Sequence, residues 1–460
     1  MAVAPPPPAT TADPLSALPE VAAAPGVTSQ EESVVGKVIR RIIPFIFLCY
    51  LIAYIDRVNI GFAKSALLKD LGFGHDVYGT GAGLFFLGYF AFEIPSNLIL
   101  EQVGARRWIS RIMITWGLVS MAFIFVQGKN SFYTMRVLLG LAEAGFFPGI
   151  VLYLTYWVPA RYRAKTGAMF MMAIPIAMLV AAPVSAALMK LDGTLGLRGW
   201  QWLFLVEGLP AVVLGVLALR YLTDTPEKAT WLPAADRQWL SAEMARERAE
   251  RQKMQKPQWW RALFNPKMLL LTVFYFLNNA ATYGIFLFLP DILAQKSGKS
   301  GFTLAGLTAI PFAFALAGMI LIGRHSDRTG ERKWHVAACA ATAATGLALA
   351  ALFQDNVVLL LLCITLSQTG QRSILGPFWS IPPIFLGGAT AAAGIALVNS
   401  LGTLGGYFGP DIMGKLRQSS SGYTTGLVVL AGALALEAIL IAFIRLPRPA
   451  PMTGARPPTR

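Results

Sequence analysis

Twelve apolar stretches, each long enough to cross a membrane, dominate this sequence. An α-helix rises 1.5 Å per residue, so about twenty apolar residues span a hydrocarbon core of about 30 Å. The stretches form two sets of six on either side of a polar segment. They lie near 42–64, 77–98, 108–127, 132–156, 166–189 and 201–222, and then near 267–289, 303–323, 334–353, 357–379, 389–411 and 422–446. This pattern predicts an all-α membrane protein in which twelve transmembrane helices form two six-helix bundles.

The composition agrees with a polytopic membrane protein. Only 14% of the 460 residues are charged, and the mean hydropathy is +0.56, whereas about a quarter of the residues are charged in a soluble domain. A net charge of +15 would suggest nucleic acid as a partner of a soluble chain. Here the membrane topology accounts for the charge, so we expect the lipid bilayer as a partner and no nucleic acid.

Composition also divides the chain into segments. Residues 1–33 are rich in proline and alanine, contain no lysine or arginine, and lack the apolar core of a signal peptide, which predicts a disordered cytoplasmic tail. The polar connector contains a mixed-charge helical run from Ser241 and no recognisable chemistry. The expected segments are the tail 1–36, the bundle 37–222, the connector 223–266, the bundle 267–446 and a cytoplasmic tail 447–460.

The distribution of lysine and arginine predicts the orientation. With both termini in the cytoplasm, about 25 basic residues fall in cytoplasmic loops and tails and about 9 in the outer loops. The positive-inside rule therefore predicts a multi-pass protein of the cytoplasmic (inner) membrane with both termini in the cytoplasm. The three cysteines, Cys49, Cys339 and Cys363, lie in apolar stretches without CxxC spacing, so neither a disulfide nor a metal site is indicated.

A loop after the second span is repeated, in similar form, after the eighth span. The first reads NLILEQVGARR and the second GRHSDRTGERK. Glycine permits a tight turn, and the carboxylates and arginines can bridge helix ends. The predicted gating residues are Glu101, Gly104, Arg106, Gly323, Asp327, Arg328, Gly330 and Arg332. Internal repeats of this kind are typical of secondary transporters, whose substrate site lies between the halves.

Two spans of the first half each contain a cation and a carboxylate: Asp56 and Arg57 lie in the first, and Arg136 and Glu143 in the fourth. A charge inside the membrane is costly and is functional by default. An anionic substrate needs a fixed cation, and a coupling proton needs a buried carboxylate. The alternatives are that the first pair merely orients its helix at the surface, and that Arg136 and Glu143, two helical turns apart, form a buried pair that ties helices together.

The loop of residues 323–332 matches the GxxxDRxGxR signature of the major facilitator superfamily, and the loop after the second span resembles a degraded copy. The stretches YIDRVNIGFAK, RVLLGLAEAGFFPG and GPFWSIPPIFLGG resemble the anion:cation symporters within that superfamily. The resemblance implies the major facilitator fold and alternating access. It also implies import of organic anions such as sugar acids, tartrate and phthalate with protons as the coupling ion and no cofactor.

The same resemblance implies roles for the charged residues. Asp56 and Glu143 would carry the coupling protons, Arg57 would bind a substrate carboxylate, and Arg136 would support the proton site. Glu93 and Glu207 also lie in matching stretches, but bonds between helices explain them at least as well. We expect a monomer and no enzymatic activity. A channel or uniporter without proton coupling is the alternative of a different class.

The tenth span contains Gln371 and Arg372, where the family is apolar or small. A cation in each half would suit a dicarboxylate, and the methionine-rich fifth span favours an aromatic body. The sequence thus favours a phthalate-like substrate, with tartrate or a sugar acid as the alternative. Arg372 could instead extend to the cytoplasmic surface. Polar and aromatic residues expected to line the pocket are Tyr54, Tyr275, Asn278, Asn279, Tyr283, Gln368, Trp379 and Asn399.

Overall fold

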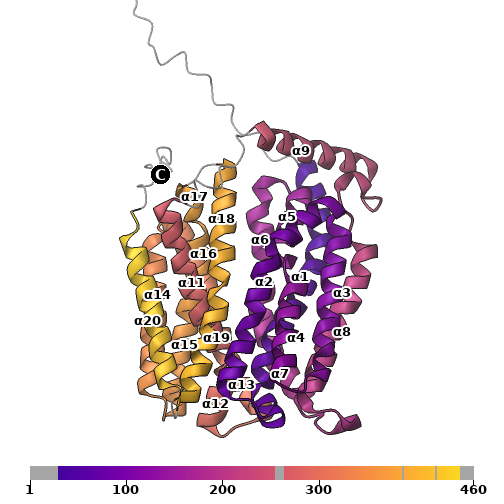
Figure 1. Cartoon of the computed structure of the whole chain (residues 1–460). Helices are drawn as coiled ribbons and strands as arrows, with labels where there is room; N and C mark the ends of the chain where they lie inside the picture. The colour runs from indigo at the N-terminus through magenta and orange to yellow at the C-terminus, as the bar shows by residue number, and fades with distance from the viewer. Residues whose placement is uncertain (1–28, 254–263, 386–387, 420–421, 446–460) are drawn as a thin grey trace, which may run out of the picture.

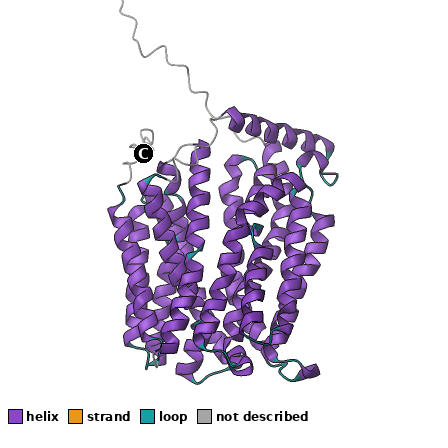
Figure 2. Cartoon of the chain, in the orientation of Figure 1, coloured by secondary structure: helices purple, strands orange, loops and turns teal. Residues whose placement is uncertain are grey.

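A computed structural model describes residues 29–253, 264–385, 388–419 and 422–445. Within these ranges the regular structure is helical and no strand is assigned, as Figure 2 shows. The helices form two bundles side by side, one from the first half of the chain and one from the second (Figure 1). Helix α9 (Ala234–Lys253) lies across one end of the first bundle. We call this end the connector side.

The first bundle contains six spans, two of them interrupted. The break between α4 and α5 falls at Gly145, whose φ of 85° is in the left-handed region that glycine adopts readily. The helices are α1 (Ser29–Leu71), α2 (His75–Val103), α3 (Ala105–Met121), α4 (Lys129–Glu143) continued by α5 (Phe146–Trp157), α6 (Ala160–Met171) continued by α7 (Ala173–Met189), and α8 (Gly199–Tyr221).

The second bundle repeats this plan with more interruptions. Its helices are α11 (Pro266–Phe286) with the short α12 (Leu289–Ser297), α13 (Gly301–Thr329), α14 (Lys333–Leu352), α15 (Val357–Ser373) with α16 (Leu375–Trp379) and α17 (Pro382–Phe385), α18 (Gly388–Thr403) with α19 (Gly405–Ser419), and α20 (Thr424–Phe443). In the described residues, eleven segments are long and apolar enough to span a membrane. The predicted span at 389–411 is divided between α18 and α19, and with it the spans number twelve.

Regular structure begins nearer the N-terminus than the sequence predicts. Helix α1 begins at Ser29, so the last part of the predicted disordered tail is helical. Glu31 and Glu32 lie in its first turn, where carboxylates interact favourably with the helix dipole. Glu31 also forms an ion pair with Arg161. The predicted tails 1–28 and 447–460 lie outside the described residues.

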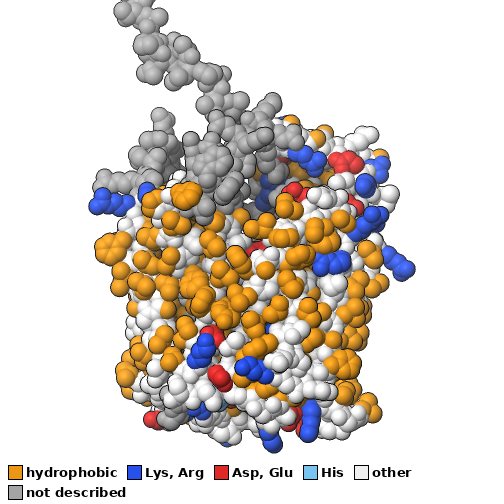
Figure 3. Space-filling model, in the orientation of Figure 1, with side chains coloured by type: hydrophobic (Ala, Val, Ile, Leu, Met, Phe, Trp, Pro, Cys, Tyr) orange, Lys and Arg blue, Asp and Glu red, His pale blue; other side chains and the backbone are white. Residues whose placement is uncertain are grey.

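The two bundles pack closely on the side opposite the connector. There α2 packs on α19, and α7 packs on α13. A Cβ atom on Gly79 would lie 2.9 Å from the Cα of Gly414, so glycine is needed for this approach of the two backbones. Figure 3 shows hydrophobic side chains over the middle of one face, with most Lys and Arg toward the two ends, as expected of a membrane protein.

Candidate functional site

Arg57 lies in the middle of α1 at the interface of the two bundles. It forms an ion pair with Glu143 of α4, and their side chains are 12% and 1% exposed. Its guanidinium carbon lies 5.1, 5.4 and 5.5 Å from the ring centroids of Tyr54, Phe85 and Tyr89. Its buried Nε has no acceptor among the described residues. The arginine is therefore held by aromatic rings and one carboxylate, with hydrogen-bonding capacity left over.

Asp56 points away from this interface, because successive residues of a helix are rotated by about 100°. It is fully buried inside the first bundle. It accepts a hydrogen bond from the Ser120 hydroxyl and one from the Asn59 amide at 3.2 Å, while Oδ2 has no partner in the described part of the chain. Asp56 and Arg57 are thus neighbours in sequence that contact different parts of the protein.

Arg136 does not form the ion pair with Glu143 that was the alternative to a supporting role. The described residues contain no ion pair between the two, which lie seven residues apart along the helix, and Glu143 pairs with Arg57. Arg136 instead donates to the backbone oxygens of Gly81 and Ala82 in α2, at 3.3 and 3.1 Å. The alternative of an Arg136–Glu143 pair is therefore wrong, since Glu143 pairs with Arg57.

Arg372, near the end of α15, brings a second guanidinium to the interface. Its Nε and one Nη are buried, with no acceptor among the described residues. Tyr54 of the opposite bundle, Tyr275 and Tyr283 lie within electrostatic range of its guanidinium. The side chain points into the protein rather than toward the membrane surface. Because Tyr54 and Tyr283 also lie beside Arg57, the two arginines lie near the same pair of tyrosines.

Of the predicted pocket residues, some lie beside these tyrosines, and others form hydrogen bonds with different parts of the protein. Trp379 packs edge-on against Tyr275 with ring centroids 4.9 Å apart. Asn279 donates to the backbone oxygen of Gly402 at 3.2 Å. Gln368 is buried and donates to Gln371 at 3.3 Å, which places it within its own bundle.

Asn399 forms a bond between the bundles. Its amide donates to Glu93 Oε1 at 3.1 Å, and the Ser400 hydroxyl donates to Glu93 Oε2 at 2.8 Å. Glu93 therefore bonds two helices together, which from the sequence alone was an explanation at least as good as a role in transport.

Two buried carboxyl groups were not predicted to be part of a site. Glu207 of α8 accepts a hydrogen bond from Ser185 at 3.1 Å and lies near Asp56. Glu437 of α20 is fully buried and accepts one from Asn278 at 2.9 Å. Each has a second oxygen without a partner in the described residues. A lone glutamate in an apolar span was the signal available in the sequence for both residues.

The two repeated loops lie on the connector side. Gly104 and Gly330 have φ of 95° and 68°, so each turn requires a conformation that favours glycine. Asp327 and Arg332 form an ion pair at 2.6 Å, whereas Glu101 is exposed. The Arg106 backbone N–H donates to Asp224 of the connector at 2.9 Å. Gly323 and Arg328 lie within the last turns of α13 rather than in a loop.

A polar latch joins the bundles on the side opposite the connector. Lys64 of α1, the last residue of the first predicted span, is fully buried. Its ammonium donates to Asp291 of α12 at 2.6 Å and to the Tyr423 hydroxyl at 2.7 Å. Ser65 also donates to Asp291, at 3.0 Å. We call Lys64, Ser65, Asp291 and Tyr423 the latch.

The other groups of the latch stabilise the ionised form of Asp291. Burial alone would raise the pKa of the Asp291 carboxyl, but the Lys64 ammonium and the neighbouring hydroxyl groups outweigh it and hold that pKa below its ordinary value. Asp291 therefore stays ionised through the physiological pH range.

Replacing Lys64 with alanine is expected to open this side of the protein. The variant leaves the half-buried Asp291 without its cation, and removing one partner of a buried ion pair commonly costs about 3 to 5 kcal/mol. The open population should rise at least about tenfold. Distances between spin labels at the exposed residues Lys129 and Lys299, one on each bundle, measure this shift. Lys69→Ala, an exposed lysine of the same helix, is the control. Unchanged distances in Lys64→Ala would contradict the role of the latch.

Comparisons with known proteins agree on one family. The model of the Major Facilitator Superfamily matches residues 46–410. A putative tartrate transporter of Agrobacterium vitis is 47% identical, over 93% of this chain and 97% of the relative. A quinolone resistance transporter of Acinetobacter baumannii is 41% identical, over 91% and 96%. The partially occluded, inward open structure of the xylose transporter from E. coli aligns with a TM-score of 0.72, 14% identity, and coverage of 90% and 99%.

Proposed function

Since this chain belongs to the major facilitator superfamily of membrane transporters, we propose that it imports an organic dicarboxylate together with protons, by alternating access. The observation that carries the proposal is a pair of arginines, one from each bundle, that lie near the same two tyrosines, Tyr54 and Tyr283. Guanidinium groups bind carboxylates through two parallel hydrogen bonds. A substrate with two carboxylates would join the bundles, as alternating access around a central site requires.

The ion pair between Arg57 and Glu143 gives a physical route to proton coupling. While Glu143 is ionised, it competes with the substrate for Arg57. Protonation of Glu143 removes that competitor and frees the guanidinium for a substrate carboxylate. Anion and proton then favour each other's binding, which is the thermodynamic condition for symport. Asp56, buried behind this pair with one oxygen unpartnered, is the proposed second proton site.

Tartrate is the first substrate to test, because a relative of 47% identity bears that name. A phthalate-like substrate is the second candidate. The rings of Tyr54, Phe85 and Tyr89 around Arg57 would pack well against an aromatic body. Thermal stabilisation of the purified protein by tartrate, sugar acids, phthalate and benzoate distinguishes these candidates. Stabilisation by none of the dicarboxylates would contradict the proposal.

Replacing Arg372 with alanine is expected to weaken dianion binding far more than monoanion binding. Only a dianion would leave a buried carboxylate unpaired, which commonly costs about 2 to 5 kcal/mol, or roughly 30-fold or more in Kd. Phthalate and benzoate form a matched aromatic pair for calorimetry, and Arg324→Ala, an exposed arginine of α13, is the control. Equal losses for both ligands would mean that Arg372 does not bind the second carboxylate.

A channel or an uncoupled uniporter is the competing function. Either would let the anion equilibrate across the membrane, and a pH gradient would not raise the internal concentration of the anion. Accumulation of unchanged substrate above its external concentration separates the proposed symport from both.

A further inference from the structure

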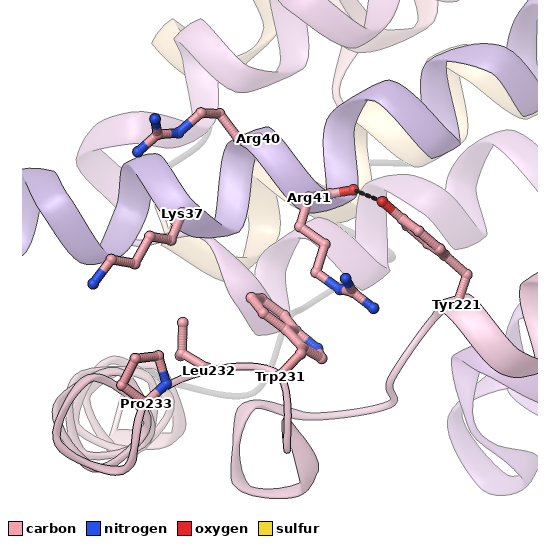
Figure 4. Close-up of a pocket in the computed structure, with 7 residues that line it drawn as sticks. All are labelled: Lys37, Arg40, Arg41, Tyr221, Trp231, Leu232 and Pro233. Carbon is pink, nitrogen blue, oxygen red and sulfur yellow. Dashed lines mark hydrogen bonds between the residues drawn. The ribbon is translucent and has the colours of Figure 1, made fainter.

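We infer that a pocket on the connector side binds the phosphate headgroup of an anionic phospholipid. The pocket has a volume of about 400 Å³ and lies between the start of α1, the end of α8 and the chain that leads into α9 (Figure 4). Its lining combines three cations with two aromatic rings: Lys37, Arg40, Arg41, Tyr221, Trp231, Leu232 and Pro233. This site is separate from the arginines between the bundles and does not depend on the proposed substrate.

The charge of the pocket suits an anion. Lys37, Arg40 and Arg41 are three and four residues apart, so they share one face of α1. Asp236 pairs with Lys37 at 2.6 Å, so one carboxylate offsets three cations. Arg40 is exposed and donates through Nε to Gly36 of its own helix at 3.2 Å. The lining therefore keeps a net positive charge.

Arg41 is held in place for binding. Its guanidinium carbon lies 4.6 Å from the Tyr221 ring centroid and 4.9 Å from that of Trp231. The Tyr221 hydroxyl donates to the Arg41 backbone oxygen at 2.9 Å, as drawn in Figure 4. The buried Nε of Arg41 has no acceptor among the described residues. A planar cation fixed between two rings, with an unused donor, matches a phosphate oxygen.

The position of the pocket favours a lipid over a soluble anion. Arg41 immediately precedes the apolar run that begins at Ile42, at the level where headgroups meet hydrocarbon. Two turns along the same face of α1 lies Leu48, which is 43% exposed. One turn back from Tyr221 on α8 lies Leu217, which is 46% exposed. Acyl chains can follow these apolar side chains while the headgroup contacts the arginines.

Native mass spectrometry of the full-length protein tests this inference. The probes are phosphatidylglycerol, which is anionic, and phosphatidylcholine, which is zwitterionic, with inorganic phosphate as a third probe. We expect one phosphatidylglycerol to be retained and phosphatidylcholine to be lost. Arg40→Ala and Arg41→Gln should each weaken retention, and the double variant should weaken it at least tenfold. Lys228→Ala, an exposed lysine of the connector, should not.

Arg40→Ala removes an exposed side chain, so a folded variant is expected even if Arg41→Gln proves unstable. Equal retention of the two lipids would overturn the inference, as would full retention of phosphatidylglycerol in folded Arg40→Ala. Displacement of phosphatidylglycerol by millimolar phosphate would also overturn it, because the site would then be one for a soluble anion.

Discussion

Arg57→Ala is expected to abolish substrate binding, with a loss of roughly a hundredfold or more in Kd. The residue pairs with Glu143, which is 1% exposed, and is proposed to hold a substrate carboxylate. Its removal deletes the cation and leaves Glu143 buried and unpaired, an effect of about 3 to 5 kcal/mol in similar cases. Arg57→Lys should also bind weakly, since an ammonium lacks the planar fork of guanidinium. Calorimetry with tartrate and phthalate measures both variants.

Two controls separate lost binding from lost folding. Arg220→Ala removes an exposed arginine near the end of α8 and should bind normally. The double variant with Arg57→Ala and Glu143→Ala removes both buried charges, so it should fold more stably than Arg57→Ala yet still fail to bind. Binding at native affinity in Arg57→Lys and Arg57→Ala would remove Arg57 from the proposed site.

Glu143→Gln and Asp56→Asn are expected to lose accumulation driven by a pH gradient. A neutral amide cannot carry the coupling proton, so the pH gradient no longer drives accumulation of the substrate. At least one variant should retain exchange of internal for external substrate, because Arg57 remains. We expect accumulation in proteoliposomes to fall at least about tenfold, the effect of losing one unit of pH gradient, or about 1.4 kcal/mol.

Glu437→Gln is the matched control for these variants. It neutralises an equally buried carboxyl group in the other bundle, where Asn278 donates to it at 2.9 Å. This variant should still accumulate substrate. If both Glu143→Gln and Asp56→Asn accumulated substrate as the native protein does, the assignment of the proton sites would be wrong.

Much of the fold could be predicted from the sequence because membrane spans depend on local composition. A run of about twenty apolar residues satisfies its own backbone hydrogen bonds as a helix, so the spans and the helical connector were visible in the sequence. The break at Gly145 and the division between α18 and α19 were not predicted. They depend on how neighbouring helices pack, and that information is not local.

The charged residues of the candidate site could be identified from the sequence, but the contacts between them could not. A charge inside an apolar span marks Asp56, Arg57 and Glu143 from sequence alone. Which carboxylate meets which arginine depends on the rotation of whole helices, so the sequence could not exclude the alternative that pairs Arg136 with Glu143. Lys64 ends the first predicted span, and its burial was not predicted because Asp291, its partner, is 227 residues away.

Uptake into proteoliposomes under an imposed pH gradient decides whether transport of the dicarboxylate is coupled to protons. With the inside alkaline, labelled tartrate or phthalate should accumulate above its external concentration, and a protonophore should abolish the accumulation. Equilibration to the external concentration regardless of the gradient, or no uptake of any dicarboxylate, would contradict the proposed symport.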